Sequence, residues 1–158
     1  RVFKPCRKKR AFMDKIIEGV ILTPLKQIVN PKGDLYHAMK QSDNGYKSFG
    51  EAYFSTVIKD EIKGWKKHTI MVLNLIVPIG AVEFIIYDDR IDSSTKNQFF
   101  SLILSQENYQ RLTVPAGVWM AFRGIGEDLN MLLNIASIEH DPSEAITKQL
   151  TDINYTWN

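Results

Sequence analysis

Two side chains that can exchange protons stand close together near the middle of the chain. Lys66 and His68 lie two residues apart in a stretch rich in apolar and β-branched residues, a composition typical of a strand. Alternate residues of a strand point to the same face, so these two side chains would share one. An imidazole titrates near neutral pH, and a desolvated lysine can also lose its charge there. The pair is therefore a candidate acid–base site.

Polar side chains also alternate on a predicted strand over residues 49–57. Glu51, Tyr53 and Ser55 would lie on one face of it. Tyr53 could stack on a sugar or a base, or it could pack in the core. Asp88 ends another predicted strand, over residues 81–88, whose alternate positions are apolar.

Several kinds of catalytic site are absent from the sequence. There is no phosphate-binding glycine loop, dinucleotide fingerprint, nucleophile elbow or zinc-ligand spacing. The three histidines, His37, His68 and His140, are scattered along the chain. A metal site needs several ligands that converge on one point, so we expect neither a metal nor another cofactor.

Composition limits the partners and the compartment. A net charge of +2 over 158 residues predicts no nucleic-acid partner, and no apolar run is long enough to predict a membrane span. The single cysteine, Cys6, excludes an internal disulfide and fits a reducing cytoplasm. Residues 1–12 form a basic tail that we expect to be solvated, although an arm for an anionic surface is an alternative.

Short apolar stretches separated by turn residues predict an all-β fold. The expected strands cover residues 16–22, 35–39, 49–57, 62–77 (as one long strand or two joined ones), 81–88, 98–104, 110–114, 118–123 and 131–135. One segment, 143–150, has helical character, with Asp141 or Ser143 as its N-cap. We therefore predict one antiparallel sandwich or barrel domain over residues 13–158, with a short C-terminal helix.

Seven motifs follow one another in an order that is typical of one enzyme family. They are Gly50-Glu-Ala-Tyr-Phe-Ser55, Ile62-Lys-Gly-Trp-Lys-Lys-His68, Tyr87-Asp-Asp-Arg-Ile-Asp-Ser-Ser-Thr95, Leu104-Ser-Gln-Glu-Asn108, Val114-Pro-Ala-Gly-Val-Trp-Met-Ala-Phe122, Leu132-Leu-Asn-Ile135 and His140-Asp-Pro-Ser-Glu144. In order and spacing the set resembles the dTDP-4-dehydrorhamnose 3,5-epimerase family and the related sugar-nucleotide ketoisomerases, which are cupins. The resemblance covers residues 16–145.

This resemblance implies a cupin jelly-roll β-barrel, usually a homodimer, that binds a nucleoside-diphosphate sugar inside the barrel. The implied activity is epimerisation or isomerisation of a 4-keto-6-deoxy nucleotide sugar in polysaccharide or deoxysugar biosynthesis. In the family, a histidine oriented by an aspartate removes a proton beside the keto group, and a late-strand tyrosine returns a proton to the other face. That is general acid–base catalysis by two opposed groups.

The chain departs from the family pattern at the positions that carry the chemistry. Lys66 replaces the base histidine, Met120 replaces a second histidine, and the late-strand tyrosine falls at or near Asn134. The orienting aspartate is retained as Asp88. Lys66 is then either a base or a fixed cation, and a neighbouring Asp88 would favour the charged form. His68 is the alternative base.

The resemblance also implies substrate contacts. Lys63 matches an arginine that suggests a diphosphate contact, and Lys32 matches one that reaches the nucleotide of a neighbouring subunit. Glu51 and Tyr53 stand at substrate-contacting positions, and Asn134 and Met120 would line the wall.

Because fold does not fix function, a binding module that has lost the chemistry is the alternative to an enzyme.

Overall fold

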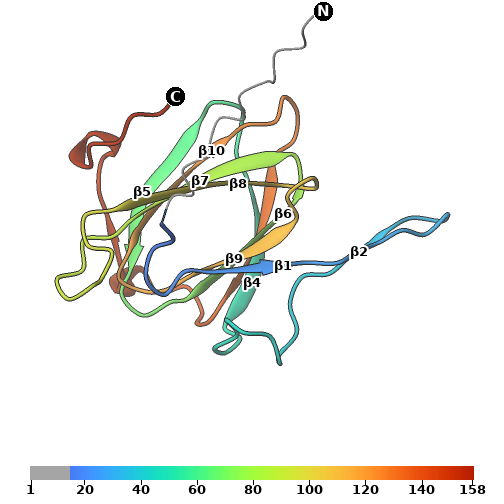
Figure 1. Cartoon of the computed structure of the whole chain (residues 1–158), viewed down its shortest axis with the longest axis horizontal. Helices are drawn as coiled ribbons and strands as arrows, with labels where there is room; N and C mark the ends of the chain where they lie inside the picture. The colour runs from blue at the N-terminus through green and yellow to red at the C-terminus, as the bar shows by residue number, and fades with distance from the viewer. Residues whose placement is uncertain (1–14) are drawn as a thin grey trace, which may run out of the picture.

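The computed structural model describes residues 15–158, and the predicted basic tail over residues 1–12 lies outside them. Two five-stranded sheets face each other, and their strands pair antiparallel (Figure 1). The first sheet has the order β1 (Ile21–Pro24), β9 (Gln110–Val114), β6 (Leu73–Ile79), β11 (Met131–Ala136) and β4 (Glu51–Thr56). The second has the order β12 (Ala145–Thr147), β5 (Ile62–His68), β10 (Trp119–Gly124), β7 (Ala81–Tyr87) and β8 (Phe99–Ser105). The predicted all-β cupin jelly roll is confirmed.

A separate hairpin of β2 (Gln27–Ile28) and β3 (Leu35–Tyr36) projects from this body (Figure 1). Its strands pair with each other and with neither large sheet. Residues 62–77, expected as one long strand or two joined ones, form two strands, β5 and β6, which lie in different sheets. No helix among residues 15–158 has the length and apolar character needed to cross a membrane.

The alternation of side chains on β7 divides the core into two parts. Val82, Phe84 and Ile86 point between the sheets and belong to the main core, as expected from the period of a strand. Ile85 points the other way, into a second cluster on the outer face with Trp65 and other aromatic side chains. β7, an inner strand of the second sheet, is thus covered on both faces.

The predicted C-terminal helix is wrong. Residues in that segment form the 3-10 turn η1 (Pro142–Glu144), then β12, and then a second 3-10 turn, η2 (Leu150–Asp152). Asp141 does cap η1, since its side chain accepts a hydrogen bond from the Ser143 amide. The helix ends after one turn because β12 pairs with β5, and the β-branched Ile146 and Thr147 suit a strand.

Candidate functional site

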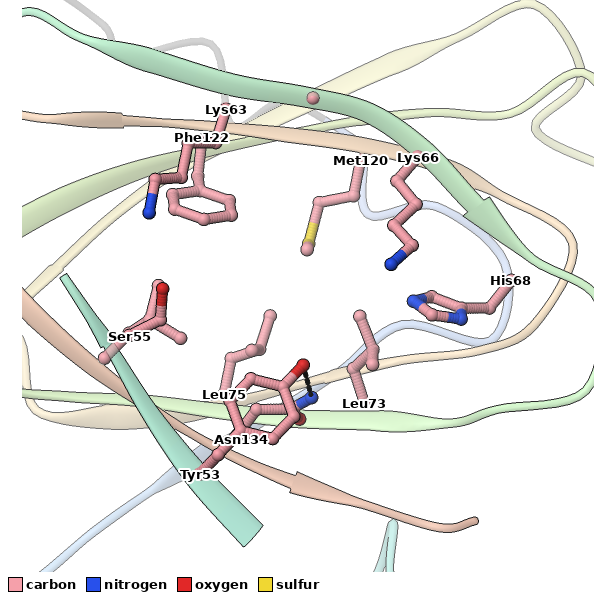
Figure 2. A pocket seen from close by; sticks show the side chains of 12 residues that line it. Tyr53, Ser55, Lys63, Lys66, His68, Leu73, Leu75, Met120, Phe122 and Asn134 are labelled. Carbon is pink, nitrogen blue, oxygen red and sulfur yellow. Dashed lines mark hydrogen bonds between the residues drawn. The ribbon is translucent and has the colours of Figure 1, made fainter. Parts of the chain in front are cut away.

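A cavity of about 210 Å³ lies between the two sheets (Figure 2). Its lining residues come from β4, β5, β6, β10 and β11. They are Tyr53, Ser55, Lys63, Gly64, Lys66, His68, Leu73, Leu75, Met120, Phe122, Leu132 and Asn134. The apolar members form its walls, and the polar ones point into it from both sheets (Figure 2). A hollow of this kind is suited to a small, partly polar ligand.

A bulge in β5 places two lysines on the cavity side of that strand. Lys66 pairs with Met120 of β10 and Lys63 pairs with Phe122, so β5 has one residue more than its partner between these pairs. Gly64 allows the bulge, because its φ is +144° and a Cβ there would lie 2.5 Å from the Ala121 side chain. The extra residue brings Lys63 and Lys66 to the same face although they are three positions apart.

His68 is held by a carboxylate that the sequence did not identify. Its Nδ1 hydrogen-bonds to Glu144 Oε1, across 76 positions of the chain. The other carboxylate oxygen, Oε2, accepts the backbone amides of Thr69, Ile70 and Met71 at 3.2, 3.1 and 3.2 Å. These hydrogen bonds hold Glu144 against the turn that follows β5. Glu144 then holds the imidazole ring of His68 in one orientation.

The electrostatics of this pair favour an ionised glutamate. Burial, to 4% exposure, raises the pKa of the Glu144 carboxyl, but hydrogen bonds from His68, Met71 and Ile70 outweigh it, and the pKa lies below its ordinary value. An ionised carboxylate can only accept, so Nδ1 of His68 carries the proton. In the neutral ring this leaves Nε2 as a free base.

Lys66 and His68 meet on one wall of the cavity, as their spacing predicted, and both point into it (Figure 2). Met120 lies beside Lys66 on the neighbouring strand. The site therefore combines a lysine ammonium group and an oriented imidazole within an apolar surround.

The opposite wall carries a second polar pair. Tyr53 of β4 and Asn134 of β11 are direct cross-strand partners. Asn134 Nδ2 donates a hydrogen bond to the Tyr53 hydroxyl at 3.0 Å (Figure 2). The two polar pairs thus face the same cavity from different sheets.

The expected contact between Asp88 and Lys66 does not form. Asp88 is fully buried, and its carboxylate accepts hydrogen bonds from Arg90 Nε at 2.9 Å and Thr95 Oγ1 at 2.7 Å, as well as from Ser93. Burial raises the pKa of the Asp88 carboxyl, but these hydrogen bonds hold it well below its usual range. The aspartate organises the loop after β7 and does not line the cavity, because the arginine two residues on is the nearer cation.

Two other sequence candidates, Glu51 and Lys32, also lie away from the cavity, and so does His37. Glu51 pairs with Ala136, one row beyond the pair of Tyr53 and Asn134, and is not among the lining residues. Lys32 is at the turn of the projecting hairpin, where its amide donates to Asn30 Oδ1. His37 lies at the base of that hairpin, with its carbonyl bound by the Tyr109 hydroxyl at 2.8 Å.

No group of three or more histidine, cysteine, aspartate or glutamate side chains among residues 15–158 is arranged to hold a metal ion. The cavity itself has one imidazole, and Glu144 occupies one of its nitrogens. The lining set fits an organic ligand with polar groups better than an ion.

Comparisons with known proteins identify several relatives. No family model matches the chain. The crystal structure of a dTDP sugar isomerase from Desulfovibrio desulfuricans G20 superposes with a TM-score of 0.85 at 30% identity, covering 89% of this chain and 92% of that chain. The probable low-salt glycan biosynthesis epimerase Agl13 of Haloferax volcanii is 25% identical over 127 residues, which is 79% of this chain and 81% of the relative.

A more distant solved structure shares the fold. It is ChmJ, a 3'-monoepimerase from Streptomyces bikiniensis, crystallised as a double mutant in complex with dTDP. Its TM-score is 0.80 at 16% identity, over 92% of this chain and 78% of that chain. This agreement concerns the jelly roll itself.

Proposed function

The chain belongs to the family of dTDP-sugar isomerases and RmlC-like epimerases, and we propose that it epimerises or isomerises a 4-keto-6-deoxy nucleoside-diphosphate sugar in polysaccharide or deoxysugar biosynthesis. The observation that carries this proposal is the His68–Glu144 pair, which presents a free imidazole nitrogen to the cavity beside Lys66. The single cysteine, Cys6, is consistent with a reaction in the cytoplasm.

His68 is the base in this proposal. Its Nε2 takes the proton from the carbon next to the keto group, and the electrons of that C–H bond form the enolate. Glu144 stabilises the imidazolium that results, and it holds the ring in the tautomer that the step needs. The same carboxylate stays ionised throughout, as the direction of its pKa shift indicates.

Lys66 is the fixed cation. Its ammonium group lies on the same wall as His68, where it can bind the keto oxygen. Negative charge grows on that oxygen as the enolate forms, so a positive group there stabilises the transition state more than the bound substrate. Non-polar side chains of the cavity wall, among them Leu73, Leu75 and Met120, lower the local dielectric and so strengthen the interaction.

Lys63 extends the positive wall away from His68. The bulge turns it toward the same cavity, and its Nζ donates to the Thr56 carbonyl at 2.6 Å. Because it is exposed to solvent, it is suited to the diphosphate, with the sugar deeper inside. The cavity is smaller than pockets that enclose whole drug-sized ligands, about 300–1,000 Å³, which fits a nucleotide that lies outside the sugar site.

Solvent exchange tests the proposed activity directly. Incubation of the protein in heavy water with dTDP-4-keto-6-deoxyglucose should place deuterium at C3, C5 or both, because the abstracted proton mixes with solvent. Proton NMR follows the loss of each signal. Binding of dTDP-, CDP- and GDP-linked 4-keto sugars without exchange into any of them would instead favour a binding module.

We also propose a homodimer in which the projecting hairpin packs on a second copy. The hairpin carries exposed apolar side chains, with Ile28, Leu35 and Val29 at 47%, 53% and 83% exposure. An apolar surface of this kind is typical of an interface. Light scattering should give a dimer at micromolar concentration, and Val29→Asp together with Leu35→Asp should give a folded monomer. A wild-type monomer at that concentration would contradict the proposal.

A further inference from the structure

We infer that Tyr53, oriented by Asn134, is the proton donor that completes the reaction from the wall opposite His68. This inference rests on the proposed function, and it concerns the half-reaction that His68 and Lys66 leave open. Tyr53 is on β4 of the first sheet, His68 is on β5 of the second, and the cavity lies between them (Figure 2).

The hydrogen bond between the two residues sets the direction of the phenol proton. Asn134 Nδ2 donates to the Tyr53 oxygen, so Tyr53 is the acceptor in that contact. Its own O–H must then point elsewhere, and the side chain lines the cavity. The described residues offer this hydroxyl no other hydrogen-bond partner, so its proton is available to a ligand.

The amide oxygen of Asn134 is a second, independent indication of a ligand. Asn134 is 1% exposed, and its Oδ1 has no hydrogen-bond partner among the described residues. A buried acceptor without a donor costs about 1–3 kcal/mol, which a bound donor removes. Sugar hydroxyls are donors, and Asn134 lines the cavity. The amide would therefore fix the sugar with its oxygen and the tyrosine with its nitrogen.

Asn134 is a positioning residue in this arrangement. When Tyr53 gives up its proton, negative charge appears on the phenolate oxygen, and the Nδ2–H already points at it. A donor that is in place before the charge forms stabilises it without reorganisation. A hydrocarbon side chain at position 134 would leave the partly exposed phenolate without this donor.

Proton transfer from Tyr53 restores the keto group. The Tyr53 O–H bond breaks, its proton joins the enolate carbon, and the enolate C=C electrons form the new C–H bond while the keto group is restored. The proton taken earlier remains on His68, and a phenolate remains on Tyr53. Transfer of a proton from the imidazolium to the phenolate through solvent returns both groups to their starting states.

Tyr53→Phe separates the two half-reactions. With dTDP-4-keto-6-deoxyglucose in heavy water, His68 should still remove a proton and return a deuteron on the same side. We expect deuterium to enter the unreacted substrate within about tenfold of the wild-type rate, while net product falls by about 100-fold or more. Proton NMR measures both quantities in one sample.

Asn134→Leu tests the positioning role with a side chain of similar size. It should lower kcat for net product about tenfold or more and lower exchange into substrate by a smaller factor, since only the sugar contact of Oδ1 serves the first step, and it should change the Kd for dTDP little. Asn134→Ala is the second variant, in case leucine packs poorly. Tyr87→Phe is the matched control, because it removes a phenol hydroxyl that bonds to Asn97 outside the cavity.

The outcomes distinguish this inference from the proposed function. No exchange with the wild-type protein would reject the activity itself. Wild-type turnover together with unchanged net product in Tyr53→Phe would reject Tyr53 as the donor. Equal loss of exchange and product in Tyr53→Phe, with dTDP binding intact, would also overturn the inference, because Tyr53 would then serve the first proton transfer.

Discussion

Replacing His68 by asparagine should reduce solvent exchange and net turnover of a 4-keto nucleotide sugar by about 100-fold or more, the usual contribution of a positioned acid–base group. The asparagine can still hydrogen-bond to Glu144, so the wall keeps its structure, but it has no nitrogen that can accept a proton. Binding of dTDP should stay close to wild type, because His68 acts on the sugar. Deuterium incorporation measured by NMR checks the rate, and calorimetry checks the binding.

Three further variants define what this loss means. His140→Asn changes an exposed histidine of the loop before η1 and should leave exchange unaffected. Lys66→Arg preserves the positive charge and should keep exchange within about tenfold of wild type, whereas Lys66→Met should not. If His68→Asn exchanges at the wild-type rate and Lys66→Arg does not exchange, then Lys66 is the base and His68 is a bystander.

Replacing Glu144 by glutamine should lower kcat by about 100-fold or more although the side chain keeps its size. The amide oxygen can take over the three backbone amides, and the NH₂ group then turns toward His68. That group donates to Nδ1, so the proton of the neutral ring moves to Nε2. The nitrogen that faces the substrate can then no longer accept a proton.

The same variant should change the dependence of stability on pH. The pKa of Glu144 is lower in the folded chain than its ordinary value of 4.5. The ionised carboxylate therefore stabilises the fold fully above that value, and the stabilisation is lost as pH falls through the folded pKa. The free energy of unfolding, measured with urea, should be larger for the wild type than for Glu144→Gln at pH 7. The difference should shrink below about pH 4.5.

Glu139→Gln provides the matched control for this experiment. It removes the same charge from a nearby exposed side chain and should change neither activity nor the shape of the stability curve. A Glu144→Gln protein with wild-type kcat would show that the imidazole does not depend on this carboxylate. The proposed base would then need another orienting group.

The sequence was sufficient for the parts of the fold that depend on local pattern. Alternation on β7 predicted which side chains face the core, and the spacing of Lys66 and His68 predicted that they share a wall. Local pattern could not exclude the helix over 143–150. Part of that segment forms β12 because it pairs with the edge of β5, which lies far away in the sequence.

The site was harder to predict for the same reason. Glu144 reaches His68 across 76 positions, and no local pattern reports such a contact. A signal was present, since Glu144 ends the motif that begins at His140, but an acid in an expected helix suggests a solvated face. From the sequence, Asp88 was the more obvious carboxylate for the site. Its carboxylate instead accepts a hydrogen bond from Arg90, two residues away.

Because β5 places functional side chains on both of its faces, it is sensitive to insertions and deletions. The strand uses both of its faces, since Trp65 fills the outer aromatic cluster while Lys63, Lys66 and His68 face the cavity. If one residue were lost between Lys66 and His68, where the strand is regular, every side chain on one side of the gap would exchange faces. The tryptophan and the acid–base group cannot both keep their places after such a change. The spacing of Trp65 and His68 is therefore as strictly constrained as the identity of the histidine, and a functional variant should alter the residues between them without altering their number.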